Sequence, residues 1–212
     1  MELKLHFLEY PGSMLSDRDI KLAISSGYLQ IKSPIELCIQ PASLDVHLAR
    51  TISFISRRRL RNSAIDLKKP VEDFMDYEEI DPVEGLTLHP REFILGVTRE
   101  WFGFTSQICG DLDGKSSLGR LGLVVHSTAG FFDPGFEGHG TLEITNLTER
   151  PLIIYPNIPV GQMRFSVLTS PSEKVYGDQS LGSKQYKNPY SQDPRPKPSE
   201  YYKNFFKDRK ND

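Results

Sequence analysis

The 212-residue sequence predicts a mainly β fold that is built from short strands. It contains 16 glycines and 15 prolines, and these residues separate nearly all of the apolar runs, which is typical of a chain with many turns. Several of the short apolar runs alternate with polar residues, as strands that bury one face do. An all-β barrel or sandwich is therefore expected.

The first regular element is expected to be one short helix that follows residues 1–13, a segment that resembles an extension ahead of the domain. Ser16 and Asp19 have the spacing of a capping box, in which each residue caps the other. The apolar residues of Ile20–Ile24 recur at helical spacing, and Gly27 is a typical helix stop.

After this helix the apolar residues follow the two-residue period of strands. In Leu44–Leu48 the apolar residues alternate with Asp45 and His47, which predicts a half-buried strand. Similar short runs follow at Leu86–Leu88, Phe93–Val97, Leu121–His126, Thr141–Thr145, Leu152–Tyr155 and Gln162–Leu168.

Composition argues against several classes of protein. Cys38 and Cys109 lie far apart and the five histidines are scattered, so neither a zinc site nor a disulfide scaffold is expected. The formal net charge of −2 argues against a nucleic-acid partner, and the basic run Arg57–Arg61 is more typical of a solvated loop. No apolar stretch approaches the length of a membrane span, and no signal peptide is evident, so a cytoplasmic protein without a membrane partner is expected.

Residues 171–212 differ in composition from the rest of the chain. They hold five prolines, five tyrosines and seven lysines, with almost no aliphatic residues, so they cannot form a core of their own. Two interpretations remain open: a disordered end, or an arm that orders over an anionic, partly flat ligand.

The segment Asp111–Glu143 holds the densest polar chemistry. Gly110–Ser116 superficially resembles a phosphate loop, but it is one residue short and lacks a βαβ context, which argues against a nucleoside triphosphatase. Lys115 and Arg120 could still supply charge to a phosphate. The alternative, a strand that ends in a capped turn with exposed cations, is the stronger interpretation of these residues by themselves.

Two acidic residues follow in this segment. Asp133 begins an Asp-Pro-Gly turn, which is common in loops. Glu143 alternates with Leu142 and Ile144, so if these two face the core, Glu143 faces either solvent or a cleft. Solvent is the more common environment of a strand glutamate.

The run GKSSLGRLGLVVHSTAGFFDPGFEGHGTLEI at residues 114–144 resembles the dCTP deaminase branch of the trimeric dUTPase-like superfamily. Further blocks that resemble this family are Met14–Ile20, Gln40–Val46, Leu88–Phe93, the surroundings of Gln162, and Leu168–Lys184. The resemblance covers about residues 14–205. It implies a distorted β-barrel of the dUTPase-like (β-clip) type over residues 14–170, and a tail, residues 171–212, that closes over the active site.

The resemblance also implies a chemistry for individual residues. Glu143 would be the catalytic acid/base, Ser116 and the Ala129 carbonyl would hold the attacking water, and Arg120 would lie near the developing charge. Asp133 would contact the sugar 3′-hydroxyl and orient a second water. The implied nucleotide contacts are Lys115, Ser116, Ser117, Leu118, Gly119, Arg120, Asp133, Thr141, Leu142, Glu143, Gln162, Tyr176, Lys184 and Asn188, with Gln185 as the alternative to Asn188.

One dipeptide bears on the product. Ala129-Gly130 is similar to the bifunctional branch of the family, which deaminates dCTP and also cleaves the triphosphate, giving dUMP, diphosphate and ammonia. Zinc-dependent base deaminases carry a Cys-x-x-C pattern that this chain lacks, so a carboxylate would replace the metal, and Mg²⁺ would enter with the triphosphate without protein side-chain ligands. The family implies dCTP as substrate, homotrimers with active sites at subunit interfaces, and dTTP as a feedback inhibitor.

Three other activities are alternatives to this bifunctional reaction. A monofunctional deaminase would release dUTP instead of dUMP. A catalytically idle member of the family would bind nucleotides or a partner protein. A plain dUTPase is excluded because that group lacks the glutamate found here at Glu143.

Overall fold

The structure, a computed structural model, describes residues 6–56, 64–126, 128–178, 180 and 194–210, so the basic run Arg57–Arg61 lies outside the described residues. The elements are η1 (His6–Glu9), α1 (Asp17–Ser25), β1 (Leu29–Lys32), β2 (Ile39–Gln40), β3 (Ser43–His47), β4 (Thr51–Ile55), η2 (Glu72–Phe74), β5 (Met75–Glu79), β6 (Leu86–Leu88), β7 (Phe93–Phe104), β8 (Ile108–Gly114), α2 (Ser116–Gly119), β9 (Leu123–Val125), β10 (Phe131–Phe132), β11 (Glu137–Asn146), β12 (Leu152–Ile154), β13 (Pro159–Val167) and η4 (Tyr201–Lys210). The predicted mainly β fold with short helices is confirmed.

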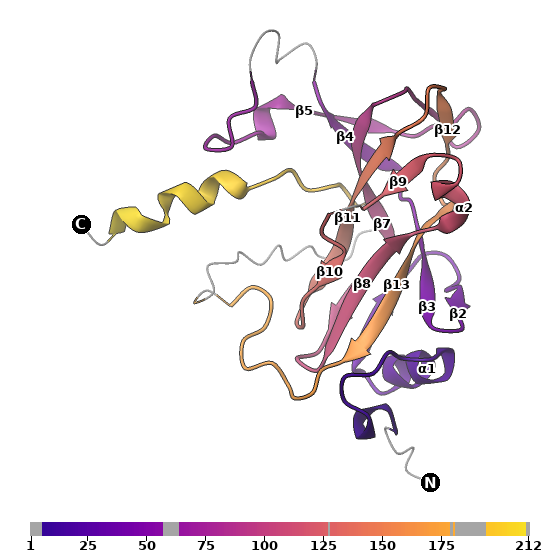
Figure 1. Cartoon of the computed structure of the whole chain (residues 1–212), viewed down its shortest axis with the longest axis vertical. Helices are drawn as coiled ribbons and strands as arrows, with labels where there is room; N and C mark the ends of the chain where they lie inside the picture. The colour runs from indigo at the N-terminus through magenta and orange to yellow at the C-terminus, as the bar shows by residue number, and fades with distance from the viewer. Residues whose placement is uncertain (1–5, 57–63, 127, 179, 181–193, 211–212) are drawn as a thin grey trace.

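The strands form three antiparallel sheets (Figure 1). The six-stranded sheet has the order β5-β4-β7-β11-β9, with β1 also paired to β7, and the five-stranded sheet has the order β10-β8-β13-β3-β2. Strands β12 and β6 pair separately. Among the described residues, the ladders do not close into one continuous barrel, which corrects the geometry of the prediction but not its fold class. Aromatic residues join the two large sheets, as Phe102 of β7 and Phe165 of β13 lie with ring centroids 6.4 Å apart.

Helix α1 forms for the reasons its sequence indicates. The backbone N–H of Asp19 donates to Ser16 Oγ over 3.4 Å, and Ser16 Oγ in turn donates to the Asp19 carboxylate over 3.0 Å. Ile20 and Ala23 are fully buried against the sheets. Gly27 has a φ of 80°, a left-handed conformation that glycine adopts without steric cost, and its N–H donates to Ile24 O. The predicted capping and stop signals are confirmed.

Strand β11 carries the alternation that the sequence predicts. Leu142 and Ile144 are both 0% exposed and belong to the core, so Glu143 lies on the opposite face. The strand is paired with β7 along most of its length, whereas β9 pairs only with Ile144–Asn146. The part of β11 that precedes Ile144 is therefore not paired with β9, and other groups can approach it from that side.

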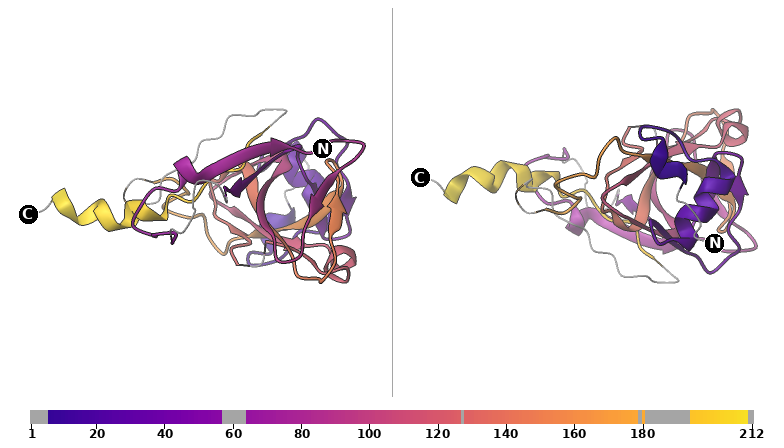
Figure 2. Two further views of the ribbon diagram at one scale, coloured as in Figure 1. Left: turned by 90° about the horizontal axis from the view of Figure 1, so that it is seen from above. Right: turned by 90° about the horizontal axis from the view of Figure 1, so that it is seen from below.

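The first described residues pack on the domain, whereas the last ones extend from it. Phe7 of η1 is buried with its ring edge-on to Tyr28, and Gly12 N–H donates to Val167 O over 2.8 Å. The C-terminal segment runs past β11 and ends in η4, which extends away from the sheets in all three views (Figures 1 and 2). None of the helices in the described ranges is long and apolar enough to cross a membrane.

Candidate active site

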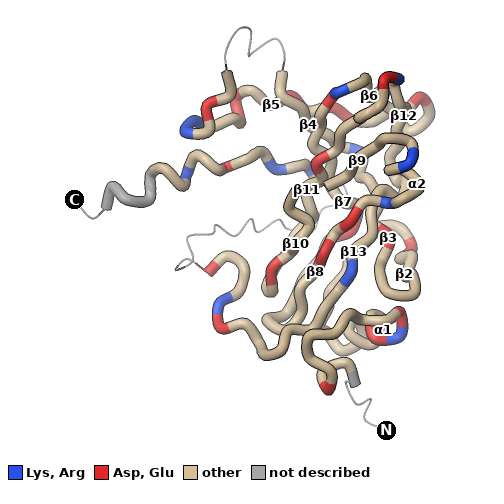
Figure 3. Tube along the Cα trace, viewed as in Figure 1, with Lys and Arg blue, Asp and Glu red and all other residues tan. Residues whose placement is uncertain are grey.

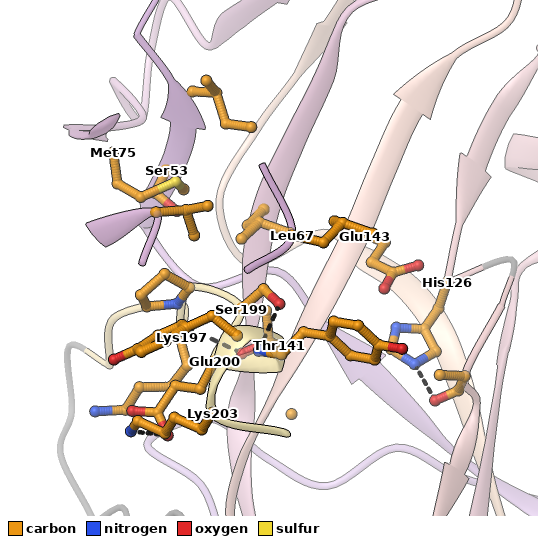
Figure 4. Close-up of a pocket in the computed structure, with 18 of the residues that line it drawn as sticks. Ser53, Leu67, Met75, His126, Thr141, Glu143, Lys197, Ser199, Glu200 and Lys203 are labelled. Atoms are coloured by element: carbon orange, nitrogen blue, oxygen red, sulfur yellow. Dashed lines mark hydrogen bonds and ion pairs between the residues drawn. The ribbon is translucent and has the colours of Figure 1, made fainter. Parts of the chain in front are cut away.

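A cavity of about 950 Å³ lies between β11, the β10 turn, the arm formed by residues 64–75, and the C-terminal segment (Figure 4). Five residues implied by the family resemblance line it, namely Ala129, Asp133, Thr141, Glu143 and Tyr176. Its opposite wall is apolar, with Ile55, Leu67 and Met75 among the lining residues. The cavity thus combines polar groups along one side with an apolar wall, which is typical of small-molecule sites.

Glu143 projects into this cavity from β11 and is half-buried. Thr128 Oγ1 donates a hydrogen bond of 2.7 Å to Glu143 Oε2. The other carboxylate oxygen, Oε1, does not take part in this bond, so both of its lone pairs can accept from a substrate or water. Glu143 occupies a cleft, which is the less common of the two environments that its alternation permits.

His126 lies next to Glu143 in the cavity (Figure 4). Its backbone N–H donates to Glu143 O over 2.7 Å, and its φ of 57° is uncommon for a residue other than glycine, although histidine adopts it more readily than most. Its Nε2 lies 2.6 Å from the Ala129 carbonyl oxygen, and its ring stacks on Phe132. The Ala129 carbonyl, expected to hold a water, thus already has one partner and retains one lone pair for another.

Asp133 and Tyr176 meet at the turn that follows β10. Tyr176 N–H donates to Pro134 O over 2.7 Å, and its ring lies against Phe136 with centroids 5.5 Å apart. Burial, and secondly the charge of Asp133, raise the pKa of Tyr176. Residues far apart in the sequence are thereby brought together at one wall of the cavity.

The turn from Lys115 to Arg120 lies outside this cavity. Lys115 is the N-cap of α2 and Arg120 is its C-cap. Ser116, Ser117, Gly119 and Arg120 are exposed, and none of the residues from Lys115 to Arg120 lines the cavity that holds Glu143. The Lys115 ammonium instead lies 2.7 Å from Asp45 Oδ1 on β3. One chain therefore does not bring the two halves of the expected site together.

The remaining residues that the family resemblance implies as nucleotide contacts lie outside the cavity, in the core, or outside the described residues. Gln162 is half-buried on β13, outside the cavity. Leu142 is fully buried in the core, so only its backbone could reach a nucleotide. Lys184, Gln185 and Asn188 lie outside the described residues.

Close packing against β8 explains why position 130 holds glycine. A Cβ at this position would lie 2.5 Å from the Leu112 carbonyl oxygen, and Gly130 O accepts the Leu112 N–H over 2.8 Å. Gly130 does not line the cavity. Backbone of β8 thus fills the space that a side chain at position 130 would take.

The C-terminal segment forms a further wall of the cavity. Lys197 N–H donates to Thr141 Oγ1 over 3.1 Å, and residues 197–204 line the cavity (Figure 4). Lys68 of the arm lies 5.5 Å from the Phe205 ring centroid. The hydrogen bond to Glu200 raises the pKa of Lys203. These contacts place residues 197–204 at the cavity wall, and an arm that orders over a ligand stays a prediction.

Two residues at the site were not among the predicted functional residues. His126 and Thr128 both follow β9 and contact Glu143. Their signal in the sequence is weak, consisting of polar residues directly after an apolar run. The apolar wall, from the arm and the tail, has no local signature because distant segments form it.

The family resemblance implies Mg²⁺, and the side chains of the cavity can be compared with the ligands that this ion prefers. Among the described residues, no three His, Cys, Asp or Glu side chains gather to hold a metal ion. Asp133 supplies one carboxylate to the cavity. Glu143 and Glu200 also line the cavity, so its walls offer oxygen donors of the kind that Mg²⁺ prefers.

Comparisons with known proteins agree with this architecture. A profile described as dCTP deaminase-like matches residues 14–168. A curated relative named dCTP deaminase, dUMP-forming, from Corynebacterium jeikeium is 45% identical over 192 residues, which span 91% of this chain and 98% of that protein. The protein of the same name from Mycobacterium tuberculosis is 43% identical over 196 residues, or 92% of this chain and 98% of that protein.

Among solved structures, the 2′-deoxycytidine 5′-triphosphate deaminase of Agrobacterium tumefaciens superposes with a TM-score of 0.58 and 22% sequence identity. The superposition covers 74% of this chain and 48% of that chain, so it bears on the fold. The profile match and the two curated relatives show the family: the chain belongs to the dCTP deaminase-like proteins.

Proposed function

We propose that this protein is a dCTP deaminase of the dUMP-forming type, which converts dCTP and water into dUMP, diphosphate and ammonia and so supplies dUMP for dTMP synthesis. The observation that supports it best is the half-buried carboxylate of Glu143 in a cavity, held by Thr128, in a chain whose curated relatives bear that name. Glu143, Ser116, Arg120, Ala129 and Asp133 are the proposed catalytic residues.

For deamination, Glu143 takes a proton from a water that attacks C4 of cytosine. It gives this proton to N3, then takes the proton of the new C4 hydroxyl and gives it to the amino group, which leaves as ammonia, so that one carboxylate acts twice as base and twice as acid. The hydrogen bond from Thr128 occupies Oε2 and leaves Oε1 for these transfers. The second lone pair of the Ala129 carbonyl and the Ser116 hydroxyl would hold the water.

For triphosphate cleavage, Asp133 is the proposed orienter of a second water, because it is the exposed carboxylate at the cavity wall next to Tyr176. Mg²⁺ bound to the phosphate oxygens would neutralise the charge that builds up on them. Asp133 also remains the proposed partner of the sugar 3′-hydroxyl.

The separation of Glu143 from the Lys115–Arg120 turn supports a homotrimer. Because none of the turn residues lines the cavity of its own chain, a neighbouring subunit would supply Ser116 and Arg120 to each site. The substrate dCTP places the proposed enzyme in the cytoplasm. Inhibition by dTTP, which shares the sugar and triphosphate of dCTP, belongs to the same proposal.

The test incubates the pure protein with dCTP and Mg²⁺ and separates the nucleotide products. We expect dUMP and diphosphate from the wild type, and a loss of deamination of about 100- to 10,000-fold in Glu143→Gln, which keeps the shape of the side chain but not its basicity. Release of dUTP without dUMP would identify a monofunctional deaminase. Binding of dCTP without turnover would identify the idle family member.

A further inference from the structure

The face of the five-stranded sheet that points away from the core carries a row of polar side chains. Gln162 of β13 is paired with Asp45 of β3 on one side and with Asp113 of β8 on the other. Residues directly opposite one another in antiparallel ladders share a face. Leu44 and Val46, the neighbours of Asp45, are fully buried in the core, which places Asp45 on this polar face.

Charged residues on this face form pairs across the strands. Figure 3 shows the acidic positions of β8 beside the basic position of β13. Arg164 of β13 lies 2.8 Å from Asp111 and 2.6 Å from Asp113. One more pair spans the central strand: Lys115, at the end of β8, reaches Asp45 on β3 over 2.7 Å.

The Asp45–Lys115 pair is more buried than the other. The side chains of Lys115 and Asp45 are 20% and 7% exposed, against 36% and 51% for Arg164 and Asp111. The second carboxylate oxygen of Asp45 accepts a hydrogen bond of 3.3 Å from Gln40 Nε2. Removal of one member of such a buried pair is costly, because it leaves the other charge without its partner in a desolvated place.

Lys115 is fixed through its backbone as well. Its N–H donates to Val160 O over 3.2 Å, and its carbonyl oxygen accepts from Leu118 and Gly119 in the first turn of α2. Ser116 and Arg120 follow directly and are exposed. The position of Lys115 therefore determines where these two side chains project.

We propose that Asp45 is the positioning residue of the Lys115–Arg120 turn, because its carboxylate holds the Lys115 ammonium across β13 and thereby fixes the turn that binds the triphosphate of dCTP. This inference rests on the proposed function. Lys115 acts as the tether of the turn, while the exposed Arg120 carries cationic charge to the phosphates. Loss of Asp45 should therefore weaken nucleotide binding, and it should also slow the chemical step because Ser116 and Arg120 of the same turn are proposed catalytic residues.

The experiment compares Asp45→Asn with wild type in two assays. We expect KM for dCTP to rise about tenfold and kcat to fall as well, since the loosened turn binds the nucleotide and also carries Ser116 and Arg120. In the Glu143→Gln background, the Kd of dCTP measured by titration calorimetry should rise by the same factor. Loss of folded protein would instead lower the apparent kcat at constant KM.

Two further variants keep the test sharp if Asp45→Asn folds poorly. Lys115→Met should give the same rise in KM, and Asp45→Asn/Lys115→Met should be no worse than Lys115→Met, because both act through one contact. Glu100→Gln is the matched control: it removes the buried carboxylate charge that lies 2.7 Å from His47, a half-buried residue that is also on β3. It should lower the melting temperature and leave KM unchanged.

The outcomes separate this inference from the proposed function. Unchanged KM and Kd in Asp45→Asn overturn the positioning role. A lower KM overturns it too, since Asp45 would then be withholding Lys115 from the phosphates. If the wild type binds dCTP but forms no product, the proposed function fails, and the calorimetric comparison still decides the role of Asp45.

Discussion

Thr128 Oγ1 lies 2.7 Å from Glu143 Oε2 and donates a hydrogen bond to it. Thr128 follows β9 and Glu143 is on β11, and the backbone bond from His126 N–H to Glu143 O keeps the two segments together. The segment that contains Thr128, Ala129 and Gly130 thus also orients Glu143, the proposed acid/base. Removal of this hydrogen bond has a measurable consequence.

Thr128→Val is expected to lower kcat for dCTP deamination by roughly tenfold or more, which is the value of one hydrogen bond to a charged group. KM should change less, because Thr128 orients Glu143 and does not itself bind the nucleotide. Thr128→Ser, which keeps the hydroxyl, is the control and should restore most of the rate. Equal rates for the valine and serine variants would show that the bond is irrelevant to catalysis.

Gly130→Ala is expected to destabilise the protein by about 1–3 kcal/mol, the usual cost of overpacking. The new methyl group would meet the Leu112 carbonyl oxygen, and backbone of β8 cannot move aside as a flexible side chain can. Chemical denaturation measures the change. Gly119→Ala, with nothing within 4 Å of its Cβ, is the control and should be neutral or stabilising. A neutral Gly130→Ala would contradict the packing explanation.

Truncation after residue 193 is expected to raise KM for dCTP by roughly tenfold, because the cavity loses the wall that residues 197–204 form. The sheets should keep their melting temperature within a few degrees, since the removed segment contributes little to the core. Steady-state kinetics and thermal denaturation of the same preparation check both. A fall in KM would mean that the segment competes with the nucleotide for Thr141.

Tyr176 should make stability depend on pH in the alkaline range. Burial, and then the charge of Asp133, raise its pKa above the ordinary value of 10.0, so the unfolded chain loses the phenolic proton first as the pH rises. Its stabilising contribution is complete below that value and is lost as the pH rises through the folded-state pKa. The free energy of unfolding should fall more steeply above about pH 10 in wild type than in Tyr176→Phe.

Urea denaturation at several alkaline pH values measures this difference. Asp133→Asn removes the second cause of the shift and should give an intermediate slope. Parallel curves for wild type and Tyr176→Phe would show that the phenol titrates alike in the folded and unfolded chains.

Local patterns in the sequence predicted what local interactions control. The Ser16 cap, the Gly27 stop and the alternation around Glu143 all depend on neighbours within a few residues, and each is found in the structure. Of the residues that the family motifs imply, Ala129, Asp133, Thr141 and Tyr176 lie with Glu143 along the cavity, whereas the Lys115–Arg120 turn lies outside it. The sequence by itself therefore determined the fold class, the family and the residues proposed for catalysis.

Only the tertiary structure decided how these residues meet. The ion pair of Asp45 with Lys115, the contact of Lys197 with Thr141, and the placement of the Lys115–Arg120 turn away from Glu143 join segments far apart in the chain. No local pattern encodes such contacts, because strand pairing and packing set them. The same reason explains how the strands of the expected distorted barrel divide into separate sheets, and it gives Gly130 a packing role against β8.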